Sequence, residues 1–273
     1  MRIAIFYFSG TGNTWRMAQS LMEGFIARQV PVEMHSIETV STDGVSAIIS
    51  RNDIIGIGYP IYGSDIPLIM QDFLKKLPFP PKPVPVFIFC TQWMFSGDGT
   101  RVSLEFIQSE NYQVSWSEHF LMPNNVCVSF IRLPYTTDQR KIDRMVFHMN
   151  RRIDTLVERV CSSRPHTRGF NIFSKWLGLM QRKPFRKYFP TWRDDIGIDR
   201  MRCSGCGLCA SICPVGNIEK DTLLFQGRCI LCVRCYNFCP ENAITYKGLP
   251  HDKSRGNPYR GPRGYQIERK NNP

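Results

Sequence analysis

Short apolar runs alternate with helical patterns along the first part of the chain. Runs of strand type lie at residues 2–8, 31–37, 53–59, 84–91 and about 112–122, and helical stretches lie at 14–28, 66–77, 99–108 and 136–161. Strands that alternate with helices build parallel sheets covered on both faces. The pattern therefore predicts a doubly wound α/β domain.

The first apolar run leads directly into a loop of small and polar residues, which are Ser9, Gly10, Thr11, Gly12, Asn13 and Thr14. Glycines let backbone N–H groups approach an anion, and the start of the following helix adds a favourable dipole. The loop lacks the Lys of a nucleoside-triphosphate loop and the third Gly of a dinucleotide fingerprint. A terminal monophosphate fits it best, and a solvated turn is the structural alternative.

Two further loops are rich in aromatic residues and glycine. In doubly wound sheets, ligands lie outside the carboxyl ends of the strands, so the loops after strands one, three and four should converge. Aromatic rings that flank glycines suit a flat ligand ring, although ordinary packing is an equal alternative for Tyr62, Trp93 or Phe95. The predicted ring contacts are Pro60, Ile61, Tyr62, Gly63, Thr91, Gln92, Trp93, Phe95, Gly97 and Asp98.

The loop of residues 9–14, with the two later loops in matching positions, resembles the FMN site of flavodoxins. The resemblance implies a flavodoxin-like, five-stranded parallel sheet with strand order 2-1-3-4-5 over residues 1–162. It also implies that the first loop holds the FMN phosphate and that the other two loops contact the flavin ring.

Eight of the eleven cysteines form two copies of one pattern, Cys-x-x-Cys-x-x-Cys-x-x-x-Cys-Pro, which are 26 residues apart. Two-residue spacers let three sulfurs face inward from one loop, as an iron–sulfur cube requires. A zinc site needs only separated Cys-x-x-Cys pairs, and a disulfide framework needs an oxidising compartment. The doubled pattern therefore favours iron–sulfur clusters over both alternatives.

The doubled pattern resembles the bacterial two-cluster ferredoxins, over residues 196–247. The resemblance implies a small α+β domain with two 4Fe–4S clusters, each of which takes its fourth ligand from the other copy. One ligand set is then Cys203, Cys206, Cys209 and Cys239, and the other is Cys229, Cys232, Cys235 and Cys213.

The formal charge of +12 is concentrated outside the predicted sheet. Residues 1–160 carry 15 basic and 15 acidic side chains, whereas residues 161–202 carry 10 and 3. Basic surface near a redox centre favours an acidic partner, such as a ferredoxin or flavodoxin. No nucleic-acid recognition motif accompanies the charge, and the basic tail of residues 248–273 is short and rich in Gly and Pro.

Residues 163–195 form a basic, aromatic connector. Aromatic residues mixed with cations are compatible with a helix on a membrane surface, but Pro184 is expected to interrupt such a helix. The favoured prediction is that the connector packs one domain against the other, through Phe170, Phe173, Trp176, Leu177 and Met180. No apolar run reaches membrane-spanning length and no export signal is recognised, so a soluble, cytoplasmic protein is expected.

The whole chain resembles the fused flavodoxin–ferredoxin proteins of anaerobic prokaryotes. FMN exchanges one or two electrons and each cluster exchanges one, so the resemblance implies a carrier that relays electrons between FMN, two clusters and a separate redox partner. The alternative is an FMN-dependent reductase of a small organic acceptor. Such a reductase needs a proton donor near the flavin, and the available residues are Tyr62, Asp65, Cys90 and Asp98.

Overall fold

The computed structural model describes residues 1–267. Residue contacts divide it into two units. The first unit contains Met1–Ser9, Asn13–Met122 and Met145–Phe185, and the second contains Gly10–Gly12, Pro123–Arg144 and the described residues from Arg186 onward. This division differs from the consecutive segments 1–162, 163–195, 196–247 and 248–273 that the sequence predicts. Residues 268–273, which end the predicted tail, lie outside the described residues.

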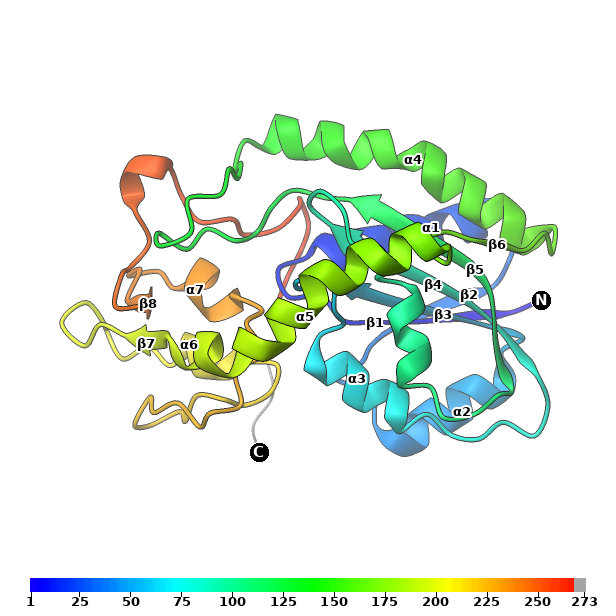
Figure 1. Ribbon diagram of the computed structural model, residues 1–273, viewed down its shortest axis with the longest axis horizontal. Coiled ribbons are helices and arrows are strands. Elements are labelled where there is room, and N and C mark those ends of the chain that lie inside the picture. The colour runs from blue at the N-terminus through cyan, green and yellow to red at the C-terminus, as the bar shows by residue number, and fades with distance from the viewer. Residues whose placement is uncertain (268–273) are drawn as a thin grey trace. The chain divides into compact units, whose positions relative to one another are not determined.

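The first unit, here the sheet unit, is built on a parallel sheet (Figure 1). The strands are β1 (Ile3–Tyr7), β2 (Val32–Ser36), β3 (Ile54–Pro60), β4 (Val84–Gln92), β5 (Tyr112–Leu121) and β6 (His166–Thr167). Their order is β2-β1-β3-β4-β5-β6, and every neighbouring pair is parallel. The order of the first five strands is the flavodoxin-like one, which confirms the predicted fold class. The two-residue strand β6 extends the edge.

The helices of the sheet unit match the predicted ones with two exceptions. They are α1 (Asn13–Ile26), α2 (Thr42–Arg51), α3 (Leu68–Lys75) and the greater part of α4 (Gln139–Cys161), whose residues up to Arg144 belong to the second unit. In addition, η1 (Arg101–Glu105) is a short 3₁₀ helix. The predicted helix over 99–108 is therefore only this 3₁₀ segment, and α2 has no counterpart in the prediction. The N-cap of α2 could nevertheless be recognised in the sequence, because Ser is common at this position. In the structure, the Ser41 hydroxyl accepts a hydrogen bond from the Gly44 N–H.

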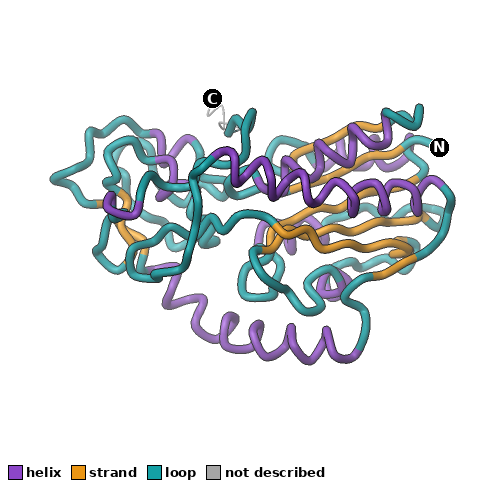
Figure 2. The backbone as a smooth tube through the Cα atoms, turned by 90° about the horizontal axis from the view of Figure 1, so that it is seen from above, coloured by secondary structure: helices purple, strands orange, loops and turns teal. Residues whose placement is uncertain are grey.

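The sheet has apolar side chains on both faces, as a covered parallel sheet requires. Alternate residues of β1, including Ile3 and Ile5, belong to a buried cluster with side chains of α1 and α4. Phe6 points to the opposite face, where its ring lies 5.3 Å from that of Phe73 in α3. Figure 2 shows the strands side by side, with helices along the sheet.

The predicted connector is largely one helix, α5 (Ile172–Asp194), which is drawn unbroken in Figure 1. The expectation that Pro184 interrupts it is wrong, since the helix continues through Pro184 and Pro190. A proline inside a helix removes one backbone hydrogen bond and typically costs about 3 kcal/mol. The packing of Gly178, Arg182 and Phe185 against loops of the sheet unit offsets part of that cost.

The second unit, here the cluster unit, contains two short antiparallel strands, β7 (Ile196–Ile198) and β8 (Ile244–Tyr246). Its helices are α6 (Leu208–Ser211), α7 (Arg234–Phe238) and the 3₁₀ segment η2 (Lys253–Arg255). Its core joins Ile196, Val233, Tyr236 and Ile244 to Val128, which comes from the segment before α4. Among the helices of residues 1–267, none combines the length and the apolar character needed to cross a membrane.

Candidate functional site

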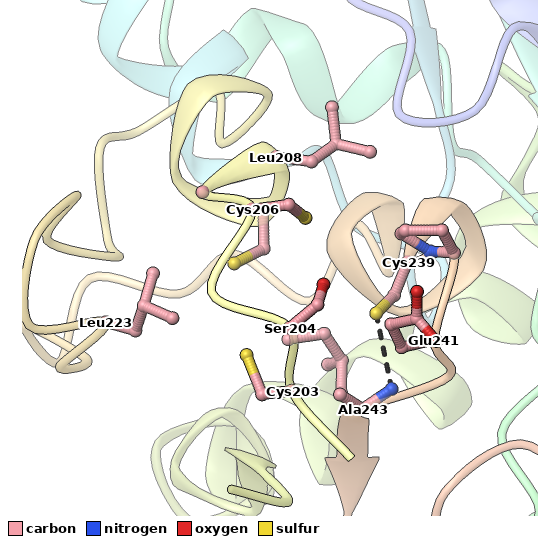
Figure 3. A pocket seen from close by; sticks show the side chains of 12 residues that line it. Cys203, Ser204, Cys206, Leu208, Leu223, Cys239, Glu241 and Ala243 are labelled. Carbon is pink, nitrogen blue, oxygen red and sulfur yellow. Dashed lines mark hydrogen bonds between the residues drawn. The ribbon is translucent and has the colours of Figure 1, made fainter.

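The eight patterned cysteines surround two separate cavities of the cluster unit. The first cavity is lined by Cys203, Cys206, Cys209 and Cys239, and Figure 3 shows Cys203 and Cys239 reaching it from two different segments. The second cavity is lined by Cys213, Cys229, Cys232 and Cys235. The structure therefore brings together the two crossed sets, each with three cysteines of one copy and the fourth cysteine of the other.

Backbone N–H groups point at the sulfurs in the same way in both copies. The N–H groups of Gly205 and Leu231 each lie 3.4 Å from the sulfur two residues earlier, Cys203 or Cys229. The N–H of Asn217 donates to the Cys213 sulfur and that of Ala243 to the Cys239 sulfur, each at a distance of 3.2 Å. Such contacts stabilise the thiolate form, in which cysteine binds iron.

Burial works against the thiolate form. It raises the pKa of the Cys209 and Cys229 thiols to about 11 and that of Cys232 to about 12. Buried thiolates need a compensating positive charge, which bound iron supplies. Among residues 1–267, no three His, Cys, Asp or Glu side chains stand close enough to hold a single metal ion. The four sulfurs instead surround a cavity, an arrangement that fits a cube with iron at its corners.

Three of the six predicted phosphate-loop residues, Gly10, Thr11 and Gly12, belong to the cluster unit and are buried. The Gly10 carbonyl accepts a 2.8 Å hydrogen bond from Arg234 Nε, and the Thr11 hydroxyl accepts one of 3.0 Å from Asn125. Within residues 1–267, the N–H groups of Gly10 and Thr11 donate no hydrogen bond. Buried N–H groups normally have an acceptor, so this short stretch fits a bound anion.

Gly12 has φ +98°, and a side chain there would come within 2.6 Å of the Tyr265 ring. The C-terminal segment therefore lies against the loop, a contact that the sequence pattern did not indicate. Of the other loop residues, Ser9 and Thr14 are buried and Asn13 begins α1. The Thr14 hydroxyl makes a buried 2.8 Å hydrogen bond with the Thr91 hydroxyl, which links the loop after β1 to the end of β4.

The two predicted ring-contact loops pack against α5 in the sheet unit. A side chain at Gly63 would collide with the Phe185 ring, and one at Gly97 with the backbone of Gly178. Arg182 joins the two loops, because its Nη1 lies 2.9 Å from the Ser64 carbonyl and 2.8 Å from the Asp98 carboxylate. Gly63, Gly97 and Asp98 thus contact α5 in this arrangement.

The remaining predicted ring contacts lie around these loops with varied exposure. Thr91 is buried, Trp93 is half-buried, and Phe95 is 43 % exposed. Pro60, Ile61, Tyr62 and Gln92 are also half-buried, and Pro60 pairs with Thr91 in the sheet. Tyr62 and Asp65 form a one-pair antiparallel bridge that closes the loop after β3.

Sequence reasoning missed two buried arginines. Arg182 is 2 % exposed and forms the bidentate pair with Asp98, and Arg234 is 1 % exposed and binds the Gly10 carbonyl as well as that of Ile212, at 3.0 Å. Their partners lie 84 and 224 residues away along the chain. No local pattern could reveal them, apart from the general rule that a buried charge needs a partner.

Two family models match the cluster unit, and both are described as 4Fe-4S binding domains. They cover residues 196–219 and 226–246, one for each cysteine copy. No curated protein matches the chain.

The sheet region is similar to several solved structures. A flavodoxin from the domain Archaea is 17 % identical with a TM-score of 0.41, over 59 % of this chain and 99 % of its own. Flavodoxin from Megasphaera elsdenii is 20 % identical with a TM-score of 0.37, over 57 % and 98 %. Rubredoxin oxygen:oxidoreductase from Desulfovibrio gigas is 18 % identical with a TM-score of 0.36, over 57 % and 37 %.

The assignment of the first unit rests on its strand order and that of the second on its family matches. The chain joins a flavodoxin-like doubly wound sheet to a 4Fe–4S binding region, the fused flavodoxin–ferredoxin architecture.

Proposed function

We propose that the chain is an electron carrier with two 4Fe–4S clusters and one FMN, which exchanges electrons with a separate redox protein in the cytoplasm. The observation that carries the proposal is the gathering of the eight cysteines into two crossed sets around two cavities. The 10 basic and 3 acidic side chains of residues 161–202 favour an acidic partner.

The burial of the available acids favours a carrier over a reductase. A reductase needs a proton donor that can reach its substrate at the flavin. Cys90 is fully buried, and burial raises its pKa far above the usual range. Asp98 is 3 % exposed and paired with Arg182, and Asp65 is 3 % exposed with an oxygen that accepts the Ile66 N–H. Only Tyr62 of the four residues is more than slightly exposed.

The first experiment measures the metal content of anaerobically purified protein. We expect about eight irons and eight acid-labile sulfides per chain. Stoichiometric zinc without labile sulfide would instead establish the zinc alternative and overturn the proposal.

Paired serine substitutions test the crossed ligand sets. Cys206→Ser with Cys239→Ser removes two ligands of one set, so about four irons should remain. Cys206→Ser with Cys213→Ser removes one ligand from each set, so both clusters should be lost or damaged. The opposite result, with the second double variant retaining four irons, would mean that each copy of the motif binds its own cluster.

FMN is the part of the proposal supported by the N–H groups of the buried residues Gly10 and Thr11, which have no acceptor within residues 1–267. When bound, FMN would allow electrons to be taken up in pairs and released singly. The Thr11 hydroxyl accepts from Asn125 and so keeps its own hydrogen to donate to a phosphate.

A comparison of FMN with riboflavin tests this part. Thr11→Val keeps the side-chain shape but removes a charge-assisted hydrogen bond of roughly 1.5–3 kcal/mol, so FMN affinity should fall about tenfold or more. Riboflavin, which lacks the phosphate, should bind weakly to both forms. Thr42→Val, at an exposed site in α2, is the control and should leave FMN affinity unchanged. Equal affinity of the unaltered protein for FMN and riboflavin would show that the loop does not bind the phosphate.

A further inference from the structure

Helix α5 carries an exposed apolar stripe. Ile172 is 87 % exposed, Phe173 69 %, and Trp176 and Met180 57 % each. Positions 173, 176 and 180 are three and four residues apart, so they lie on one side of the helix. The Phe173 and Trp176 rings stack with centroids 6.3 Å apart. The packing role predicted for Phe173, Trp176 and Met180 is therefore wrong, because their side chains face solvent.

The opposite side of α5 is anchored, which fixes the direction of the stripe. Gly178 contacts Gly97, and Arg182 forms the buried pair with Asp98. Arg182 follows Met180 by two positions, which is about 200° around an α-helix. The stripe cannot turn inward while the Arg182–Asp98 pair is intact.

Exposed cations accompany the stripe. Lys175, Lys183 and Lys187 are all exposed, and α5 contains no acidic residue before Asp194. The loop that contacts α5 at Gly97 adds two more exposed apolar side chains, since Met94 is 57 % and Phe95 43 % exposed. An apolar strip with exposed lysines on its own helix is complementary to a surface that has an apolar interior and anionic groups at its face.

We propose that this outer face of α5, defined by Ile172, Phe173, Trp176 and Met180, binds the surface of an anionic lipid bilayer. Trp and Phe side chains are favoured at the boundary between headgroups and acyl chains, and lysines beside them can extend their ammonium groups to lipid phosphates. Each lysine near an anionic membrane contributes about 1 kcal/mol of attraction. The helix lies on the membrane and does not cross it.

Vesicle flotation with the full-length protein tests the proposal. The unaltered protein should bind vesicles of phosphatidylcholine with about 30 % phosphatidylglycerol at low salt, and bind pure phosphatidylcholine at least about tenfold more weakly. The triple variant Phe173→Ser, Trp176→Ser, Met180→Ser should lose about tenfold or more in partitioning. The control Phe147→Ser removes an equally exposed ring, 68 % exposed, from α4 and should bind as the unaltered protein does.

A second set of variants tests the charges. Lys175→Gln, Lys183→Gln and Lys187→Gln together should lower binding to anionic vesicles severalfold and weaken its salt dependence. The same change at the exposed residues Lys82, Lys141 and Lys220 should have little effect, although the net charge changes equally. All substituted side chains are exposed, so the variants should melt as the unaltered protein does.

Three results would overturn the proposal. The first is that the unaltered protein does not bind anionic vesicles at low salt. The second is that the stripe variant and the Phe147→Ser control bind vesicles equally. The third is that the stripe variant loses concentration-dependent self-association while its binding to vesicles is unchanged. The last result would assign the outer face of α5 to contact between copies of the chain.

Discussion

The two copies of the cysteine motif share a backbone but differ in surroundings. Each copy has left-handed residues at the same three positions, Gly205, Gly207 and Gly216 in the first and Leu231, Val233 and Asn242 in the second. Cys206 in the first copy is exposed, whereas the matching Cys232 is 7 % exposed. The N–H groups and sulfurs are arranged alike in both, so the ligand geometry depends on the backbone and the surroundings are free to differ.

The difference has a physical origin in the side chains of the second copy. Val233 and Tyr236 are part of the core of the cluster unit, and Arg234 is buried. Their counterparts 26 residues earlier are Gly207, Ala210 and Leu208. The second copy thus contributes two side chains to the core of the unit, and the first copy exposes Cys206, one of the residues that line its cavity. We expect the first cavity to exchange electrons with the partner, because electron transfer requires close approach.

The largest expected effect comes from replacing Arg234 of the second copy by leucine, which is the residue at the matching position of the first copy, Leu208. Arg234→Leu leaves the buried carbonyls of Gly10 and Ile212 without their donor. Each charged hydrogen bond contributes about 1.5–3 kcal/mol, so the free energy of unfolding should fall by about 3–6 kcal/mol in anaerobic guanidinium titrations. The loss of a cation should also lower the reduction potential of the second cluster.

The control for this change is Arg228→Leu. Arg228 is exposed and its guanidinium donates to the Gly216 carbonyl, at 3.1 Å, so its removal should cost less than about 1 kcal/mol. If Arg234→Leu and Arg228→Leu lowered the free energy of unfolding by similar amounts, burial would not distinguish the two copies.

Metal removal tests the difference in solvent access. A membrane-impermeant iron chelator should strip the two clusters at different rates, with the first lost about tenfold faster because Cys206 is exposed and Cys232 is not. Absorbance and electron paramagnetic resonance should then show two phases. In Cys206→Ser only the slow phase should remain, and in Cys232→Ser only the fast one. If iron were lost from the unaltered protein in a single phase, the two cavities would not differ in solvent access.

The smallest effect concerns the left-handed positions themselves. At Gly207, φ is +68° and a Cβ would meet nothing within 4 Å, so Gly207→Val should cost only the conformational penalty of about 1–2 kcal/mol. Val233→Gly relieves a similar penalty at φ +52° but removes a side chain that is 7 % exposed. The relief of backbone strain and the loss of buried apolar surface oppose each other, so the net change in unfolding free energy should stay within about 1 kcal/mol.

If Gly207→Val had no effect on stability, the first loop would not need its left-handed conformation. Thermal melts of the two single variants and of the double variant would measure this, and the double variant should be additive, because positions 207 and 233 lie in different loops.

Patterns of residues that are close in sequence predicted many features of this structure. The alternation of apolar runs and helices predicted the first five strands, because strand and helix periodicity depend on neighbours along the chain. Their order was implied by the resemblance to flavodoxins. The doubled cysteine spacing predicted three sulfurs of each set, because these three come from a single loop, and the resemblance to two-cluster ferredoxins implied the fourth. The Ser41 N-cap of α2 could have been read in the same way.

Contacts between distant residues could not be predicted in this way. The sequence by itself determined the doubly wound sheet and the two cysteine loops, since short-range periodicity and spacing specify them. Only the tertiary structure decided that α5 continues through Pro184, that Arg182 fills the space between two predicted ring loops, and that residues 10–12 belong to the cluster unit. These outcomes depend on partners up to 224 residues apart, whose burial and charge pairing outweigh local preferences.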